Sequence, residues 1–312
     1  MINYKEKYGR TNSAFADPYD RRDWKFKDSV FAVSPRGIPD NYQTKDSPFT
    51  YDQGSTMMCA ACAYNFIRFL QEREAGQSEL TEPLSPAFTY CNRPDEEAME
   101  GMYLKSPLRN GKNGSILFKE FPDYGLLSTL KVKFDANKTD WMKKAKPFAI
   151  NSYYECNSRK EVQQAIMNTG AVLIGIQVYD CFYAPDKNGH INYNPNKDYI
   201  SDGGHALAVY GWKTDKNGKL WWLVKNSWGE GYGIKGSCWL PEEYPWMQNA
   251  YVAVDNTMEM KFTQYMEKFY GDHGVDYDIE FDIAETLNKI VNKIKLFFEK
   301  MYQLIVAKLI RR

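Results

Sequence analysis

The second half of the chain carries three apolar runs that are typical of buried β-strands. They span residues 171–178, 206–212 and 220–225. The last two runs are joined by residues 213–219, whose Asp, Asn and Gly content is typical of a hairpin loop. Strand-like sequence begins at about residue 149 and continues from there, so this half is expected to form a sheet.

The part of the chain before residue 149 is predicted to be helical instead. Residues 57–74 show the one-face spacing of a helix, with apolar side chains at Ala63, Phe66, Ile67 and Leu70. Within residues 82–127, one helix is expected to open at Leu84-Ser85-Pro86 and another to lie at residues 115–121.

Helices followed by strands indicate an α+β fold rather than alternating α/β units. We expect two lobes, a helical lobe around residues 57–127 and an antiparallel, β-barrel-like lobe around residues 149–257. Residues 1–50 are polar and rich in Asp, Arg, Pro and Ser, which predicts an extended lead-in that wraps the core. The expected organisation is therefore a lead-in, one two-lobed domain over residues 51–257, and a C-terminal extension over residues 258–312.

The C-terminal extension contains a long amphipathic stripe. Its apolar residues recur in a 4-3-4-3 spacing at Ile283, Leu287, Ile290, Ile294, Phe297, Met301 and Leu304. This spacing predicts a helix of about three to four heptads. From residue 286 to 312 there are seven basic residues and one acid, Glu299. Three roles stay open for such a helix, namely docking on the protein's own domain, self-association, and attachment to a membrane surface or larger assembly.

Composition excludes some classes of function. Lysine plus arginine equals aspartate plus glutamate, at 40 each, so no overall positive field would recruit nucleic acid. The start of the chain lacks the apolar core of a signal peptide, and no 18-residue apolar run predicts a transmembrane helix. Six cysteines in 312 residues do not form a disulfide scaffold. We therefore expect a cytoplasmic or particle-associated protein.

Cys59 lies where a nucleophilic thiol would be activated. A thiol attacks an amide only as a thiolate, and the free N–H groups of a helix N-terminus favour negative charge. Cys59 follows the loop at residues 52–56 and lies near the start of the predicted helix. Gln53, six residues upstream across a glycine turn, is placed to bring its side-chain amide beside the Cys59 N–H. Two such donors would stabilise the oxyanion of an acyl-transfer reaction.

One of the three histidines stands in a structured context. His205 opens the strand-like run 206–212, and Asn226 ends the next run. Adjacent antiparallel strands would place these side chains together, so that Asn226 holds the imidazole and fixes its tautomer. His190 and His273 lie in turn-like sequence and are interpreted as solvated loop residues.

At this point the sequence resembles the papain family of cysteine peptidases over about residues 20–257. The resemblance rests on short motifs: Gln53-Gly54-Ser55 leading to Cys59, Gly204-His205-Ala206, Asn226-Ser227-Trp228-Gly229, Gly231-Tyr232-Gly233, Gly236 and Trp239-Leu240-Pro241. It implies Gln53 in the oxyanion hole, Cys59 as nucleophile, His205 as base and Asn226 as the orienting residue. Trp228 would shield the Asn226–His205 hydrogen bond from water. The separation of 146 residues between Cys59 and His205 fits the roughly 130–150 residues typical of the family.

The resemblance further implies a polypeptide substrate and no metal or organic cofactor. It is nearer to the compact bacterial and viral branch, without a large inhibitory prosegment. One departure is the flank Thr56-Met57-Met58, where the family usually has a Cys-Gly-Ser pattern before the nucleophile. Thr56 removes the usual disulfide partner, and the two methionines would narrow the entrance.

Other functions are weighed against the peptidase. Cys59 and Cys62 form a C-x-x-C pair, but neither a thioredoxin-like context for redox chemistry nor a second ligand pair for zinc is evident. A non-catalytic binding or structural module of a larger assembly would keep the fold without the reaction. An amidase or transpeptidase acting on cell-wall peptides would share the chemistry. Cys91, Cys156, Cys181 and Cys238 are interpreted as packing residues.

Overall fold

The computed structural model of the chain describes residues 12–21, 23–32, 37–45, 49–74, 82–93, 101–122, 127–198 and 200–255. The predicted amphipathic helix of the C-terminal extension, and His273, lie outside the described residues. Within the described ranges, no helix is long and apolar enough to span a bilayer.

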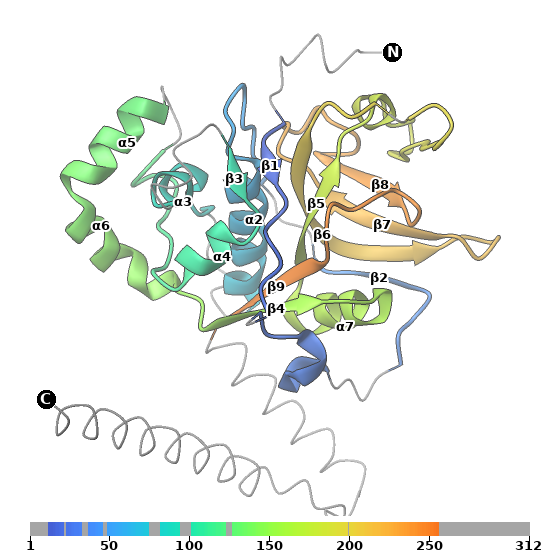
Figure 1. Cartoon of the computed structure of the whole chain (residues 1–312), viewed down its shortest axis with the longest axis horizontal. Coiled ribbons are helices and arrows are strands. Elements are labelled where there is room, and N and C mark those ends of the chain that lie inside the picture. The colour runs from blue at the N-terminus through green and yellow to red at the C-terminus, as the bar shows by residue number, and fades with distance from the viewer. Residues whose placement is uncertain are drawn as a thin grey trace, which may run out of the picture. The chain divides into compact units, whose positions relative to one another are not determined.

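The helical part is organised around α2 (Cys59–Glu74), a long buried helix near the centre of the molecule (Figure 1). It begins two residues after the predicted start. Helix α3 (Pro86–Cys91) opens as expected, because Ser85 caps it by accepting a hydrogen bond from the Phe88 N–H at 3.0 Å. Three further helices are α4 (Ser106–Gly111), α5 (Leu127–Ala136) and α6 (Lys138–Ala145).

The prediction of a helix at residues 115–121 is wrong. These residues form an isolated bridge and turns, because their main chain pairs with the segment that enters α3. The Ser85 N–H donates to the Ile116 carbonyl at 2.8 Å, and the Phe118 N–H donates to the Pro83 carbonyl at 2.8 Å. Main-chain groups used in this way are not available for helical hydrogen bonds.

The strand-rich part is a seven-stranded antiparallel sheet in the order β4-β9-β5-β6-β7-β8, with β2 also paired to β6. The three predicted runs become its centre, β5 (Val172–Gln177), β6 (Gly204–Thr214) and β7 (Leu220–Lys225). The remaining strands are β2 (Asn41–Gln43), β4 (Ser152–Cys156), β8 (Ser237–Pro241) and β9 (Ala250–Val254). Helix α7 (Arg159–Thr169) packs on this sheet, and the short turns of helix are η1 (Phe26–Asp28), η2 (Val30–Ala32), η4 (Lys146–Phe148) and η5 (Asp180–Tyr183).

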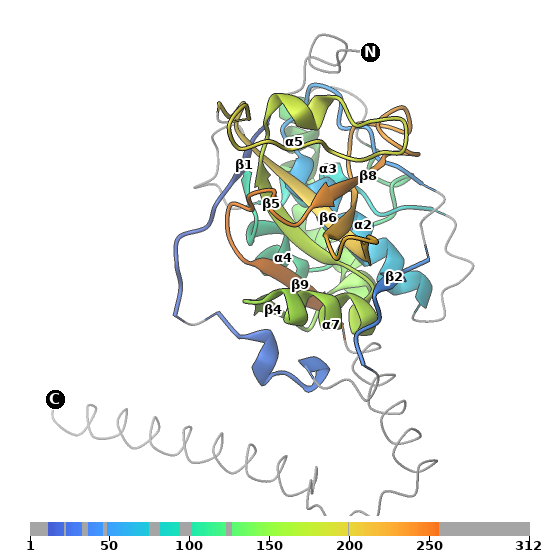
Figure 2. The same cartoon turned by 90° about the vertical axis from the view of Figure 1, so that its right-hand side faces the viewer.

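Helix α2 packs against β6, so the helical and strand-rich parts meet along these two elements (Figure 2). The α+β class predicted from the order of helices and strands is therefore confirmed. A second, two-stranded sheet lies beside this junction. It pairs β1 (Ala14–Phe15) of the lead-in in parallel with β3 (Met102–Tyr103), and β1 also contacts β6.

A buried charge cluster ties α2 to the end of β9. Arg68 is fully buried, forms an ion pair with Glu72, and its Nη1 lies 2.9 Å from Asp255 Oδ2. Gln71 donates to the Ala253 carbonyl at 2.8 Å. Burial raises the pKa of Glu72, and the neighbouring Arg68 opposes that rise. A buried charge needs such partners, so this cluster fixes the position of α2 against the sheet.

Candidate active site

Cys59 is the first residue of α2, at the edge of the junction between α2 and β6. Its side chain is 0% exposed. Main-chain hydrogen bonds from Ala206, Ser13 and Ala60 reach the sulfur, while the Ser13 hydroxyl donates to the Met57 carbonyl at 3.2 Å. Burial raises the pKa of the Cys59 thiol, and these hydrogen bonds oppose that rise. Ala206 directly follows His205, so Cys59 lies against the start of β6.

His205 and Asn226 are brought together by the pairing of β6 with β7. These strands are antiparallel, with Ala208 opposite Lys225, so that Asn226 follows the end of β7 near the start of β6. His205 Nε2 lies 2.8 Å from Asn226 Oδ1, and both side chains are buried. The Asn226 main chain is itself held, because its N–H donates to the Gly236 carbonyl at 2.9 Å. The imidazole ring is therefore fixed in orientation by a residue that is itself fixed.

Gln53 is held beside this pair by Ser227. The Ser227 hydroxyl donates to Gln53 Oε1 at 2.6 Å, and the Gln53 N–H donates to the Ser227 carbonyl at 2.9 Å. Gln53 Nε2 donates one hydrogen to the Thr56 carbonyl at 2.8 Å. An amide NH₂ group has two hydrogens, so one remains to serve a ligand.

Trp228 packs against His205 together with neighbouring aromatic rings. Its ring is fully buried and lies 5.1 Å from the His205 ring centre. Tyr183 stacks on Trp228 at 5.3 Å and 13°, and Phe182 meets Trp228 edge-on at 5.3 Å. Rings packed in this way exclude water, so the hydrogen bond between His205 and Asn226 lies in an apolar surrounding where it is stronger than in water.

Residues 12–17 of the lead-in, here called the covering segment, pass the site, and Ser13 lies against Cys59. Ser13 and Ala14 are buried, at 4% and 2% exposure. The segment runs along β3, where the Met102 N–H donates to the Ser13 carbonyl at 3.1 Å. At its start, Asn12 Nδ2 donates to the Tyr183 hydroxyl at 2.9 Å. The lead-in thus closes the site that the sequence motifs assemble.

Cys62 and His190 are another thiol and histidine weighed from the sequence that the structure describes. Cys62 is 1% exposed, one turn further along α2. In the ranges that the structure describes, no group of three or more His, Cys, Asp or Glu side chains is arranged to hold a metal ion. His190, which was interpreted as a solvated loop residue, is only partly exposed and packs at 4.8 Å from the Trp221 ring.

Comparison with known proteins decides the family. A family model described as papain family cysteine protease matches residues 94–258, just over half of the chain. The chain belongs to the papain family of cysteine proteases. His205 and Asn226 lie within the matched range, while Gln53 and Cys59 precede it.

Relatives and solved structures agree with this family. The cathepsin B-like cysteine proteinase 3 of Caenorhabditis elegans is 36% identical over 101 residues, which is 32% of this chain and 26% of the relative. The protein of that name from Ostertagia ostertagi is 36% identical over 94 residues, which is 30% of this chain and 51% of the relative. The chain thus spans between about a quarter and a half of the length of these relatives.

Two solved structures share the fold of this papain-family chain. Xylellain, a cysteine protease from Xylella fastidiosa, has a TM-score of 0.63 at 22% identity, covering 78% of this chain and 96% of that one. The procathepsin B S9 of Trypanosoma congolense has a TM-score of 0.62 at 14% identity, covering 81% and 89%. At these identities the likeness shows the α+β fold alone.

Three residues of the site were not singled out from the sequence. Ser227 lies inside the motif that contains Asn226, so a signal for it was present. Tyr183 had no signal beyond a cluster of aromatic residues near it in the sequence. Ser13 had none, because nothing in a polar lead-in indicates which of its residues lies on the thiol.

Proposed function

We propose that the protein is a peptidase that hydrolyses peptide bonds through Cys59, His205 and Asn226. One observation carries the proposal. The Cys59 sulfur lies against the main chain of Ala206, next to His205, while His205 Nε2 lies 2.8 Å from Asn226 Oδ1. A thiol, an imidazole and an amide that orients the imidazole are what nucleophilic acyl transfer requires.

The proposed reaction has two halves. In the first, His205 takes the proton of the Cys59 thiol, and the thiolate attacks the carbonyl carbon of a peptide bond. The Gln53 side chain and the Cys59 N–H donate hydrogen bonds to the oxyanion that forms. The C–N bond then breaks, His205 gives its proton to the leaving amine, and an acyl thioester remains on Cys59.

In the second half, His205 takes a proton from water, and the resulting hydroxide attacks the thioester carbonyl. The C–S bond breaks, His205 gives its proton to the departing Cys59 sulfur, and a carboxylic acid product is released. Asn226 keeps the imidazole oriented through both proton transfers, and Trp228 keeps water away from their hydrogen bond.

A second candidate is a non-catalytic module that uses the papain fold for binding. The complete burial of Cys59 under Ser13 favours it, because a thiol that is 0% exposed cannot meet a substrate. The two candidates differ in whether the covering segment ever leaves the site.

A peptide epoxide inhibitor distinguishes them. The peptidase predicts that Cys59 is labelled slowly in the wild type and faster in Ala14→Arg, which is designed to displace the covering segment. Labelling is expected to be lost in Cys59→Ala and to be weakened at least tenfold in His205→Ala. Cys62→Ala and His190→Ala are the matched controls and should label like their parent. Folded protein that takes no inhibitor at Cys59 in either background would favour the binding module.

A further inference from the structure

A carboxylate, an imidazole and an amine lie in a row on the strand-rich part of the chain. They belong to Asp186 and His190, in the segment between η5 and β6, and to Lys213, near the end of β6. We propose that Lys213 is a nucleophilic amine that takes acyl groups from activated donors such as thioesters, while His190 accepts its proton and Asp186 orients His190. His205 lies near the other end of β6, so this row shares no group with the candidate active site.

The three side chains follow one another at contact distances. His190 Nε2 lies 2.9 Å from Lys213 Nζ, and His190 Nδ1 lies 3.5 Å from Asp186 Oδ1. An amine that carries its full set of protons can only donate, so Nε2 accepts, and the neutral ring then has its hydrogen on Nδ1, facing the carboxylate. Carboxylate, imidazole and nucleophile in this order are what acyl transfer requires, here with an amine in place of a hydroxyl or thiol.

The surrounding main chain and rings hold this row in position. Asp186 Oδ1 accepts hydrogen bonds from the Asn188 N–H at 2.8 Å and from the His190 N–H at 2.9 Å. The His190 ring packs edge-on against Trp221, with ring centres 4.8 Å apart. Trp221 is also the residue opposite Lys213 in the pairing of β6 with β7. A base and a nucleophile fixed in this way need little reorganisation before they react.

The surroundings of Lys213 favour the neutral amine more than those of an ordinary surface lysine do. In the described part of the chain its Nζ pairs with no carboxylate, and it contacts His190 and the face of Trp239, 4.0 Å from the ring centre. Burial lowers the pKa of Lys213, although the charges of Asp186 and Asp215 oppose that shift, and the Trp239 face also favours the ammonium. The side chain is only half-buried, so a small acyl donor can reach it.

The proposed reaction converts the Lys213 amine into an amide. The ammonium group first gives one proton to His190 Nε2, and the free amine attacks the carbonyl carbon of the thioester. The C–S bond then breaks, a second proton passes from the nitrogen to the departing thiolate, and His190 releases its proton to water. The products are an acylated Lys213, a thiol and one proton. Asp186 stabilises the imidazolium while it exists.

Lys219 is a matched control within the same chain. Its Nζ lies over the Trp221 ring, 4.4 Å from the centre, much as Lys213 lies over Trp239, and it is also half-buried. Lys219 pairs with the Glu243 carboxylate at 2.6 Å instead of with an imidazole. A carboxylate partner stabilises the ammonium, which is not a nucleophile. Comparing the two lysines therefore isolates the effect of the imidazole.

The test measures how fast each lysine of the full chain is acetylated by the small thioester S-acetyl-N-acetylcysteamine at neutral pH, by peptide mapping. Lys213 should react at least about tenfold faster than Lys219, as expected for general-base assistance. His190→Phe keeps a ring beside Trp221 but removes Nε2, so the Lys213 rate should fall to about that of Lys219. His190→Gln keeps an acceptor for the amine but no base, so it should be equally slow.

A further variant keeps the test valid if the His190 variants fold poorly. Asp186→Asn retains the oxygen that accepts the two main-chain hydrogen bonds but loses the charge that stabilises the imidazolium. It should slow Lys213 about tenfold and leave Lys219 unchanged. Melting temperatures equal to that of the wild type would show that the fold is kept.

Two results would overturn the proposal. One is a wild-type Lys213 that is acetylated no faster than Lys219. The other is a fast Lys213 whose rate stays the same in His190→Phe and in Asp186→Asn, because exposure alone would then explain it. Lys213→Arg should remove the modified peptide and so verify its assignment.

Discussion

Replacing Asn226 with alanine removes the oxygen that lies 2.8 Å from His205 Nε2. Both side chains are buried and Trp228 covers the pair, so water cannot take over the lost hydrogen bond. During the proposed reaction the imidazole is charged, and a hydrogen bond to a charged group contributes roughly 1.5–3 kcal/mol. Each 1.36 kcal/mol is a factor of ten in rate. We therefore expect kcat/KM to fall about 10- to 150-fold.

The assay follows hydrolysis of a fluorogenic peptide in the Ala14→Arg background, where the covering segment does not limit the rate. Asn168→Ala is the matched control. Asn168 lies on α7 and donates a hydrogen bond to the Phe31 carbonyl at 2.7 Å. The Asn168→Ala variant therefore loses an asparagine hydrogen bond away from the site. It should keep kcat/KM within about threefold of its parent. If Asn226→Ala also stayed within threefold while folding normally, Asn226 would not orient the base.

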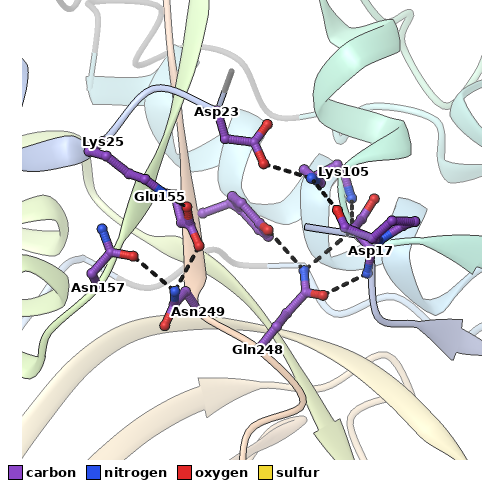
Figure 3. A network of polar contacts seen from close by, with 10 residues as sticks. Asp17, Asp23, Lys25, Lys105, Glu155, Asn157, Gln248 and Asn249 are labelled. Carbon is purple, nitrogen blue, oxygen red and sulfur yellow. Dashed lines mark hydrogen bonds and ion pairs between the residues drawn. The ribbon is translucent and has the colours of Figure 1, made fainter. Parts of the chain in front are cut away.

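Three further predictions concern the oxyanion, the buried charges and pH. Gln53→Ala should lower kcat about 100-fold with little change in KM, as for the loss of one oxyanion donor, and steady-state kinetics with a peptide substrate would check it. Arg68→Met removes the buried cation that pairs with Glu72 and Asp255. The free energy of unfolding, measured with urea, should therefore fall by about 3–5 kcal/mol. Burial works to raise the pKa of Glu155, but the hydrogen bond from Lys25 and its other partners (Figure 3) outweigh it, and the pKa is lowered from 4.5. The stability that Glu155 adds is therefore present above pH 4.5 and is lost as the pH falls through the lower, folded-state pKa. The difference in melting temperature between wild type and Glu155→Gln should be present at pH 7 and disappear in acid.

The parts of the fold that could be predicted are those whose burial leaves a pattern in the sequence. The apolar run 220–225 coincides with β7, and the helix predicted at residues 57–74 differs from α2 by two residues at its start. Helices α5 and α6 left a weaker pattern. In α5 the buried side chains are Leu130 and Phe134 alone, which is too narrow a stripe to indicate a helix among so many lysines.

The parts of the site also differ in how strong a pattern they leave in the sequence. His205 and Asn226 could be paired in advance because consecutive strands usually lie next to each other, which fixes where their ends meet. The covering segment could not be predicted, because its fit depends on the main chain. Gly101 and Gly204 make room for the backbone of residues 12–17, and a backbone has no sequence signature of its own.

The site is already assembled beneath the covering segment, and this has a kinetic consequence. His205 and Asn226 are in hydrogen-bond contact, and Gln53 is held by Ser227, while Ser13 still lies on Cys59. Opening therefore requires no rearrangement of the catalytic groups. If the covering segment and the substrate compete for one place, the closed fraction raises the apparent KM and leaves kcat unchanged.

Wild type and Ala14→Arg should then share one kcat, while the KM of Ala14→Arg is at least tenfold lower, in parallel with its faster Cys59 labelling. Initial rates measured up to saturating peptide would test this. A kcat that rose in Ala14→Arg at constant KM would mean that opening changes the catalytic groups themselves, and the site would not be preassembled.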